Sequence, residues 1–264
     1  MADSDYVFRD ANTQREWQRL RRIEEVFDAA SQRRLLAAGV RTGARCLEIG
    51  PGAGSIARWM AGQAGPSGHV TVVEINPQFL AGQTGFEVVQ GDIREVSLPA
   101  QNYDVIHGRY VLLHIPDYRK ALANMLCALK PGGYAVLEEP DFTTAKPVNG
   151  TDKEKSAVRR VNQAVEAMYR AKGIDPSFGA SLPVLAVECG LTDLNVEIDL
   201  PLVSGGMGVA EVMAQSAEQL SERYTATQVA SQEDVNTYVE MCRRPDRWAC
   251  YYSTVGVTAR KQAV

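Results

Sequence analysis

The residues best suited to chemistry follow a short apolar run near position 46. The segment Cys46-Leu-Glu-Ile-Gly-Pro-Gly-Ala-Gly-Ser55 leads from this run through Gly50, Gly52 and Gly54 into a helical pattern. Glycines let the backbone turn tightly and let a ligand approach without a Cβ atom in the way, and a helix start offers unpaired N–H groups. The segment therefore favours a nucleotide-like ligand, while glycine-rich turns made for packing alone remain the alternative.

A carboxylate ends the next apolar run, Val72-Val73-Glu74. Glu74 lies twenty residues beyond Gly54, and an acid in this place can accept hydrogen bonds from both hydroxyls of a ribose. The usual nicotinamide motif, Gly-x-Gly-x-x-Gly, would need a glycine at position 55, where Ser55 stands. The pair of features predicts a nucleoside site and weighs against a nicotinamide-dependent oxidoreductase.

The elements that must position these residues alternate between strand and helix patterns. A capping-box match at Thr13 opens an amphipathic helix to about residue 30, a second helical segment runs from about Ser31 to Gly39, and strands and helices then alternate. We expect strands near 44–49, 69–74, 86–90, 103–107 and 134–138, and helices near 55–64 and 116–130. This alternation predicts an α/β fold with a doubly wound, mostly parallel sheet.

The pattern changes after Pro140. Helices are expected from about 151 to 173, 208 to 223 and 232 to 243, with a strand through Val196, Ile198 and Leu200 and a last strand within 248–259. The two later helices are interpreted as a lid over the carboxyl edge of the sheet, with a simple packing layer as the alternative. We predict one domain over 1–264: a helical cap (1–43), a ligand-binding core (44–140), and the remaining sheet with the helical lid (141–264).

Five elements in a fixed order carry a family resemblance across residues 44–140. They are Glu48-x-Gly50-x-Gly52-x-Gly54, Val89-Gln-Gly-Asp-Ile93, Tyr103-Asp-Val-Ile-His-Gly-Arg-Tyr110, Leu112-Leu-His-Ile-Pro116 and Leu129-Lys-Pro-Gly-Gly-Tyr-Ala-Val-Leu137. Together they resemble the class I S-adenosylmethionine-dependent methyltransferases, in their small-molecule, natural-product branch. The resemblance implies a Rossmann-like sheet whose last strand runs antiparallel between its neighbours.

The resemblance also implies the cofactor, S-adenosyl-L-methionine, and the residues that hold it. Gly50, Pro51 and Gly52 would line the methionine moiety near Glu48, and Glu74 would hold the ribose. The remaining members of the implied set are Ile75 beside Glu74, Asp92 and Ile93 at the adenine, and Arg109 beside the sulfonium. A structural ion pair is the alternative for Arg109.

His114 is the candidate general base, paired with Glu139. It follows the fourth strand, where open α/β sheets bind ligands, and imidazole titrates near neutrality. A role in capping the next helix is the alternative for His114, and His107 is interpreted as structural. Residues that could form an apolar acceptor pocket are Tyr6, Phe8, Trp17, Phe142, Met207, Met213 and Tyr224.

The predicted function is methyl transfer to an oxygen of a natural product in secondary-metabolite or antibiotic biosynthesis. The alternatives are an N- or C-methyltransferase, a cyclase, hydrolase or decarboxylase that binds the cofactor without methyl transfer, and a noncatalytic cofactor-binding partner protein. His107-Gly-Arg-Tyr110 stands where an Asn-Pro-Pro-Tyr or Asp-Pro-Pro-Tyr element would indicate methylation of base amino groups. The sequence therefore disfavours DNA N-methylation.

Composition excludes further classes. Lys and Arg total 28 against 32 Asp and Glu, a net charge of −4, so no cationic field recruits nucleic acid or an anionic membrane. The five cysteines form no Cys-x-x-Cys pair, so the sequence predicts neither a metal site nor a disulfide framework and favours a cytoplasmic location. We expect a small-molecule acceptor as the partner and leave the oligomeric state open, with a homodimer as one option.

Overall fold

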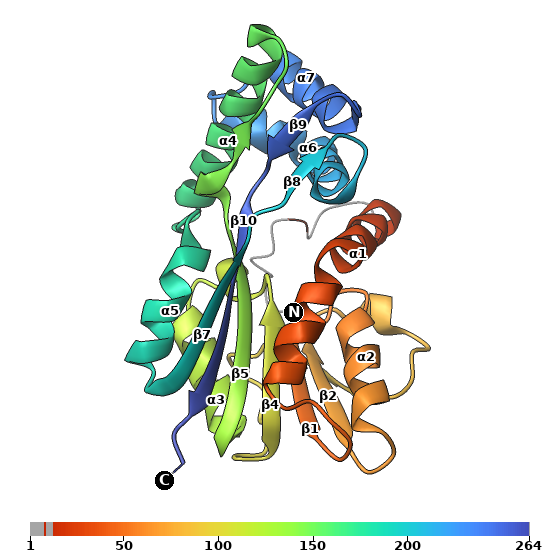
Figure 1. Cartoon of the computed structure of the whole chain (residues 1–264), viewed down its shortest axis with the longest axis vertical. Coiled ribbons are helices and arrows are strands. Elements are labelled where there is room, and N and C mark those ends of the chain that lie inside the picture. Colours follow the sequence, from red (N-terminus) through yellow and green to blue (C-terminus); the bar gives the residue numbers. More distant parts are fainter. Residues whose placement is uncertain (1–7, 9–12, 264) are drawn as a thin grey trace.

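A seven-stranded sheet forms the centre of the computed structural model, which describes Phe8 and residues 13–263 (Figure 1). Its order is β3-β2-β1-β4-β5-β10-β7, and β10 runs antiparallel to both β5 and β7 while the other pairs are parallel. The strands are β1 (Arg45–Ile49), β2 (His69–Glu74), β3 (Glu87–Gln90), β4 (Tyr103–Arg109), β5 (Leu129–Asp141), β7 (Leu191–Asp199) and β10 (Ser253–Lys261). This confirms the predicted fold class, including the antiparallel last strand between its neighbours.

Helices cover both faces of the sheet. On one face, α1 (Thr13–Ala37) and α2 (Ser55–Ala64) pack through Leu35, Ile56 and Met60 against β1, β2 and β4. On the other face, α3 (Tyr118–Ala128) and α5 (Phe178–Glu188) pack through residues such as Leu122 and Leu182. Strands buried on both faces read as nearly continuous apolar runs, which explains why the central strands were recognisable in the sequence.

The N-terminal helix differs from the prediction of two helical segments. α1 is continuous from Thr13 to Ala37, because Ser31 does not interrupt it. The Ser31 hydroxyl donates to the carbonyl of Phe27, one turn earlier, at 3.3 Å, so the polar side chain is satisfied inside the helix. The chain then turns away from the helix at Gly39. Its φ of +96° is a backbone conformation that glycine adopts readily and that other residues rarely adopt.

A second group of elements lies beyond the carboxyl ends of the central strands (Figure 1). It contains α4 (Asp152–Ala171), α6 (Gly208–Ala226), α7 (Gln232–Arg243) and a small antiparallel sheet of β6 (Lys146–Pro147), β9 (Trp248–Cys250) and β8 (Leu202–Ser204). Thr151 and Glu154 close a capping box on α4, and Ser231 and Asp234 close one on α7. The N-terminal half of α1 reaches up to pack on α6, so this group roofs the sheet edge together with α1.

The sequence prediction contained neither α5 nor the small sheet. α5 carries Pro183 in its interior and has an almost wholly apolar sequence, so it shows little helical periodicity. The strands of the small sheet are two or three residues long, too short for an alternating pattern. Short 3-10 turns complete the chain: η1 (Pro77–Leu80), η2 (Leu112–His114) and η3 (Phe142–Thr144).

Candidate functional site

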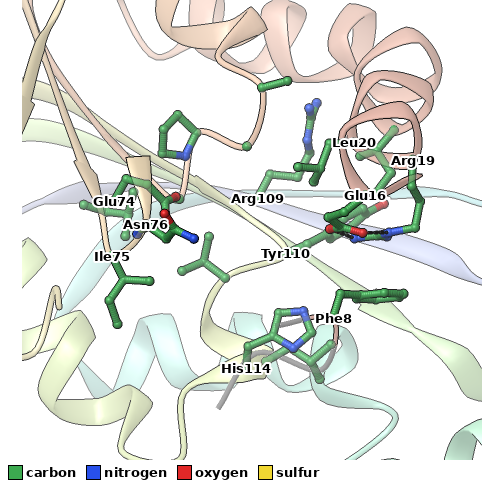
Figure 2. Close-up of a pocket in the computed structure, with 18 of the residues that line it drawn as sticks. Phe8, Glu16, Arg19, Leu20, Glu74, Ile75, Asn76, Arg109, Tyr110 and His114 are labelled. Carbon is green, nitrogen blue, oxygen red and sulfur yellow. Dashed lines mark hydrogen bonds and ion pairs between the residues drawn. The ribbon is translucent and has the colours of Figure 1, made fainter. Parts of the chain in front are cut away.

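One cavity of about 490 Å³ lies between the carboxyl ends of β1, β2 and β4 and the roof made by α1, α4 and α6. Its sheet-side half is lined by residues at the last positions of the strands or just beyond their carboxyl ends: Glu48, Gly50, Pro51, Gly52, Glu74, Ile75, Asp92, Ile93 and Arg109. Its helix-side half is lined by Glu16, Arg19, His114, Phe142, Tyr169, Met213, Tyr224 and Tyr252. Figure 2 shows the two halves, with Glu74 and Ile75 on one side and Glu16, Arg19 and His114 on the other. All the residues that the resemblance implied for the cofactor therefore face one space, together with His114.

Steric constraints favour glycine in the loop of residues 50–54, called the glycine loop below. Gly50 has a φ of +63°, and a Cβ atom there would lie 2.6 Å from Cγ2 of Val111. Gly54 has a φ of +84°, and its Cβ would lie 2.6 Å from Oε1 of Gln83. At Gly50 a larger residue must displace the loop or the short, branched Val111 side chain, whereas at Gly54 the flexible Gln83 side chain can move and the left-handed backbone is the main constraint.

Glu24 of α1 holds the start of α2, a role that the sequence did not suggest. Its Oε1 accepts from the backbone N–H of Ser55 at 3.0 Å, while Arg21 donates to Oε2 at 2.8 Å. Burial raises the pKa of Glu24, and the Ser55 N–H opposes this rise. A carboxylate at a helix N-terminus is electrostatically favourable, so α1 fixes the glycine loop from above.

Glu48 lines the cavity and has one carboxylate oxygen without a partner. The side chain is buried, its Oε1 lies 3.2 Å from Nδ1 of His107, and its Oε2 accepts no hydrogen bond from any residue that the structure describes. His107 bridges on to Glu138 through Nε2 at 3.2 Å. Burial alone would lower the pKa of His107, but the bonds to Glu138 and Glu48 outweigh it and raise the pKa to about 9. His107 therefore lies as a buried cation between two carboxylates, and it holds Oε1 of Glu48 while Oε2 is left for a ligand.

The two acids of the neighbouring strand ends are held by different means. Glu74 Oε1 accepts from the backbone N–H of Asn76 at 2.9 Å, and burial raises its pKa. Asp92 receives Nη2 of Arg94 at 2.6 Å, and these bonds lower its pKa. The amide of Asn124 donates to the carbonyl oxygens of Ile93 and Val96 at 2.7 and 2.9 Å and so fixes the Asp92 loop. Arg94 and Asn124 carried no motif signal.

Arg109 ties the sheet to α1. Its guanidinium donates to Ser31 Oγ at 2.9 Å and to Asp28 Oδ1 at 3.0 Å while it also lines the cavity. The ion pair that the sequence left open as an alternative is thus present, and it lies at the wall of the site.

Aromatic rings dominate the helix-side half. The Phe142 ring stacks on Tyr169 at 5.1 Å between centroids, and Tyr252 lies 5.4 Å from Phe142. Of the acceptor-pocket candidates, Phe8, Phe142, Met213 and Tyr224 line the cavity, whereas Trp17 and Met207 are 45% and 66% exposed elsewhere on the surface. Tyr6 lies outside the described residues. Tyr169 and Tyr252 were missed because no local spacing marks them.

The structure does not join His114 to Glu139. Oε1 of Glu139 accepts from the backbone N–H groups of Val111 and Leu112 at 3.0 and 2.8 Å, so this acid caps η2 from beneath the cavity wall. Burial raises the pKa of Glu139 to about 8. Burial, with the charges of Arg19 and Lys172, lowers the pKa of His114 to about 3. The expected pairing of His114 with Glu139 is therefore not formed. His114 is a neutral, weakly basic imidazole at the end of η2, and Glu139 supports this turn from below.

Comparison with known proteins identifies the family. A family model described as a methyltransferase domain matches residues 17–190, about two thirds of the chain. The chain belongs to the class I S-adenosylmethionine-dependent methyltransferases. The cofactor of this family is S-adenosyl-L-methionine.

The relatives of this methyltransferase are distant. Methyltransferase str2 of Strobilurus tenacellus is 29% identical over 60% of this chain and 58% of its own length, and str3 of the same organism is 27% identical over 72% and 69%. The ubiquinone/menaquinone biosynthesis C-methyltransferase UbiE of Pseudomonas savastanoi is 33% identical over 42% of this chain and 46% of its own length. The chain thus spans less than two thirds of the lengths of str2 and UbiE.

Solved structures support the fold. Phosphoethanolamine N-methyltransferase 2 of Haemonchus contortus, in complex with S-adenosyl-L-methionine, superposes with a TM-score of 0.57 and 19% identity over 99% of this chain and 60% of that one. YcgJ of Bacillus subtilis gives a TM-score of 0.53 at 17% identity over 86% of this chain and 95% of that one. Within residues 13–263, the helices lack the combination of length and apolar character that crossing a membrane requires.

Proposed function

We propose that this protein transfers a methyl group from S-adenosyl-L-methionine to an oxygen of a small aromatic molecule of the natural-product type. The observation that carries the proposal is the division of a single cavity into a polar sheet-side half and an aromatic helix-side half. A polar wall suited to a nucleoside, facing a compartment lined mainly by aromatic rings, suits two ligands of different character held end to end. Oligomeric state and cytoplasmic location stay predictions.

The sheet-side half fits the cofactor on its own chemistry. Oε2 of Glu48 is buried and has no hydrogen-bond partner within the described part of the chain, an arrangement that costs free energy unless a ligand donates to it. An α-ammonium group is such a donor, and the glycine loop leaves room for the chain that carries it. Glu74 and Asp92 supply acceptors for the ribose hydroxyls and the adenine amino group.

The chain itself supplies orientation and exclusion of water. When bound, S-adenosyl-L-methionine brings an activated methyl group on a sulfonium, so strong acid or base chemistry is not required of the protein. Holding the acceptor against Phe142, Tyr169 and Tyr252 gives the proximity and alignment that contribute roughly 7–11 kcal/mol in favourable cases. His114, neutral at physiological pH, forms a hydrogen bond with the acceptor oxygen and points that oxygen toward the sheet-side half.

Carbon is the alternative acceptor atom. The similarity to UbiE, which is a C-methyltransferase, covers 42% of this chain and supports that possibility. Aromatic rings that carry a hydroxyl group can be methylated at either atom, and the lining of the helix-side half suits both.

Binding and product analysis test the proposal in two steps. Calorimetric titration with S-adenosylhomocysteine is expected to show one site per chain, and failure to bind it would sink the proposal. Incubation of a panel of phenols with methyl-labelled cofactor is then expected to place label on oxygen. Label on ring carbon would establish C-methylation instead, and turnover of the panel without label would contradict methyl transfer.

A further inference from the structure

A buried arginine stands in the otherwise aromatic half of the cavity. Arg19 of α1 is 6% exposed, lines the cavity, and places its guanidinium carbon 3.7 Å from the centroid of the Phe8 ring. Glu16, one turn earlier and 4% exposed, accepts from Nε and Nη2 of Arg19 at 2.8 Å each (Figure 2). The pair therefore lies inside the ligand space and not on the surface, where arginines of α1 such as Arg22 are found.

The positive charge of Arg19 acts to lower the pKa values of four aromatic side chains that come from different parts of the chain. Burial lowers the pKa of His114 on η2, and Arg19 lowers it further. Burial raises the pKa of Tyr169 on α4 and Tyr224 on α6, and Arg19 opposes both rises. Tyr252, ahead of β10, has its pKa raised to about 12 by burial against the pull of Tyr110, Arg19 and Arg109. Arg19 thus stands where the walls of the helix-side half converge.

A buried ion pair is a poor source of stability, because desolvation of the two charges offsets most of their attraction. The same guanidinium is well suited to recognising an oxyanion, since it is planar, permanently charged and rich in donors. In the low dielectric of an aromatic compartment its effect on a nearby ionisable group is larger than in water.

We propose that Arg19, with Glu16 as its adjustable counter-ion, selects acceptors that present an ionised oxygen, of the phenolate or enolate class. This inference rests on the proposed function and names its acceptor class. The acceptor releases its proton to solvent on entry, and Arg19 holds the oxygen as an anion beside the aromatic rings. A weakly basic His114 then suffices, because no strong base is needed at an oxygen that is already ionised.

Spectroscopic titration of 4-nitrophenol tests the proposal without methyl transfer. Its phenolate form absorbs at a distinct wavelength, so its ionisation can be followed in the presence of the protein saturated with S-adenosylhomocysteine. Wild-type protein is expected to bind the phenolate about tenfold more tightly than the phenol, which lowers the apparent pKa of the bound probe by about one unit. Equal binding of both forms, preference for the phenol, or failure of the probe to bind overturns the proposal.

Four variants show which residue causes the preference for phenolate. Arg19→Met is expected to abolish the preference for phenolate, and Arg19→Lys to retain part of it, which guards against a loss caused by misfolding. Glu16→Gln removes the competing carboxylate and is expected to strengthen the preference. Arg22→Met, the same charge change on an exposed position of α1, should leave it unchanged. If Arg22→Met matches Arg19→Met, or Glu16→Gln weakens the preference, the proposal fails.

The binding of S-adenosylhomocysteine is measured first on every variant. A wild-type protein that does not bind it contradicts the proposed function, and the probe titration is then made on the protein alone. A wild-type protein that binds it yet shows no preference for phenolate contradicts only the role of Arg19.

Discussion

The sheet-side and helix-side halves of the cavity are built in opposite ways. In the sheet-side half each functional residue lies at or just beyond the carboxyl end of a strand, and parallel strands bring Glu48, Glu74 and Asp92 to one edge by topology alone. In the helix-side half Arg19, Tyr169 and Met213 come from three helices far apart in the sequence. One half is thus determined by backbone geometry and the other by side-chain packing, and substitutions should separate them.

The largest expected effect is in the sheet-side half. Gly50→Ala adds a Cβ atom 2.6 Å from Val111 at a φ of +63°, so the loop or the Val111 side chain must move. We expect the affinity for S-adenosylhomocysteine to fall at least ~100-fold, about 2.7 kcal/mol, by calorimetry. Gly62→Ala, at a helical position with open space, serves as the control. Near wild-type affinity in Gly50→Ala would show that the loop adapts freely.

The buried charge network behind Glu48 gives the next effect. The pKa of His107 is raised from 6.5 to about 9, so its stabilising contribution is fully present below pH 6.5 and is lost as pH rises through about 9. His107→Gln should lose on the order of 2 kcal/mol of unfolding free energy at pH ~6, and the gap from wild type should narrow above pH ~9.

Urea unfolding at several pH values measures this gap, with His69→Gln as the control at an exposed histidine. The pKa of Glu139, raised to about 8, affects wild type and variant alike, so their difference isolates His107. A gap that does not change with pH would mean that His107 is neutral in the folded protein.

In the helix-side half, His114→Ala is expected to lower turnover about tenfold or more through lost orientation of the acceptor, while cofactor affinity stays nearly intact. Because the pKa of His114 is lowered to about 3, kcat/KM should show no ionisation of this group between pH ~5 and ~8. Steady-state kinetics and calorimetry on the same preparation give both values. Unchanged turnover would leave His114 as a packing residue.

The smallest effect, that of Glu139→Gln, is expected where the two halves meet. Glu139 caps η2, which begins directly after Val111, the neighbour of Gly50, and carries His114 into the helix-side half. Since burial raises the pKa of Glu139 to about 8, the acid is protonated in both the folded and the unfolded protein below pH ~4, and Glu139→Gln should change the unfolding free energy there by less than ~0.5 kcal/mol.

The same pKa gives this position a pH dependence of its own. Because the pKa of this acid rises on folding, the folded protein loses stability as pH increases from about 4.5 through about 8. The unfolding free energy of wild type should therefore fall relative to that of Glu139→Gln over that interval. Glu139→Ala, which removes the acceptor oxygen, should cost about 1–3 kcal/mol by the same urea unfolding. If Glu139→Gln and Glu139→Ala have equal unfolding free energies, the oxygen of residue 139 does not stabilise η2.

Sequence patterns located the central sheet well because their cause is local. The strand at 69–74 and the helix at 55–64 have the predicted bounds, and the capping boxes at Thr151 and Ser231 begin helices as expected. The prediction failed where the cause was not local. The division of α1 was wrong because an internal hydrogen bond keeps Ser31 helical, and the pairing of His114 with Glu139 was not found because backbone amides claim the acid.

The sequence by itself determined the class of this protein and the residues of the sheet-side half, because glycines with positive φ and acids at strand ends have a local signature that parallel topology brings together. Only the tertiary structure decided how the helix-side half is lined, that Arg19 lies inside it, and that Glu139 supports a turn. The physical reason is that burial and electrostatic environment depend on which helices cross above the sheet, and no spacing along the chain encodes that crossing.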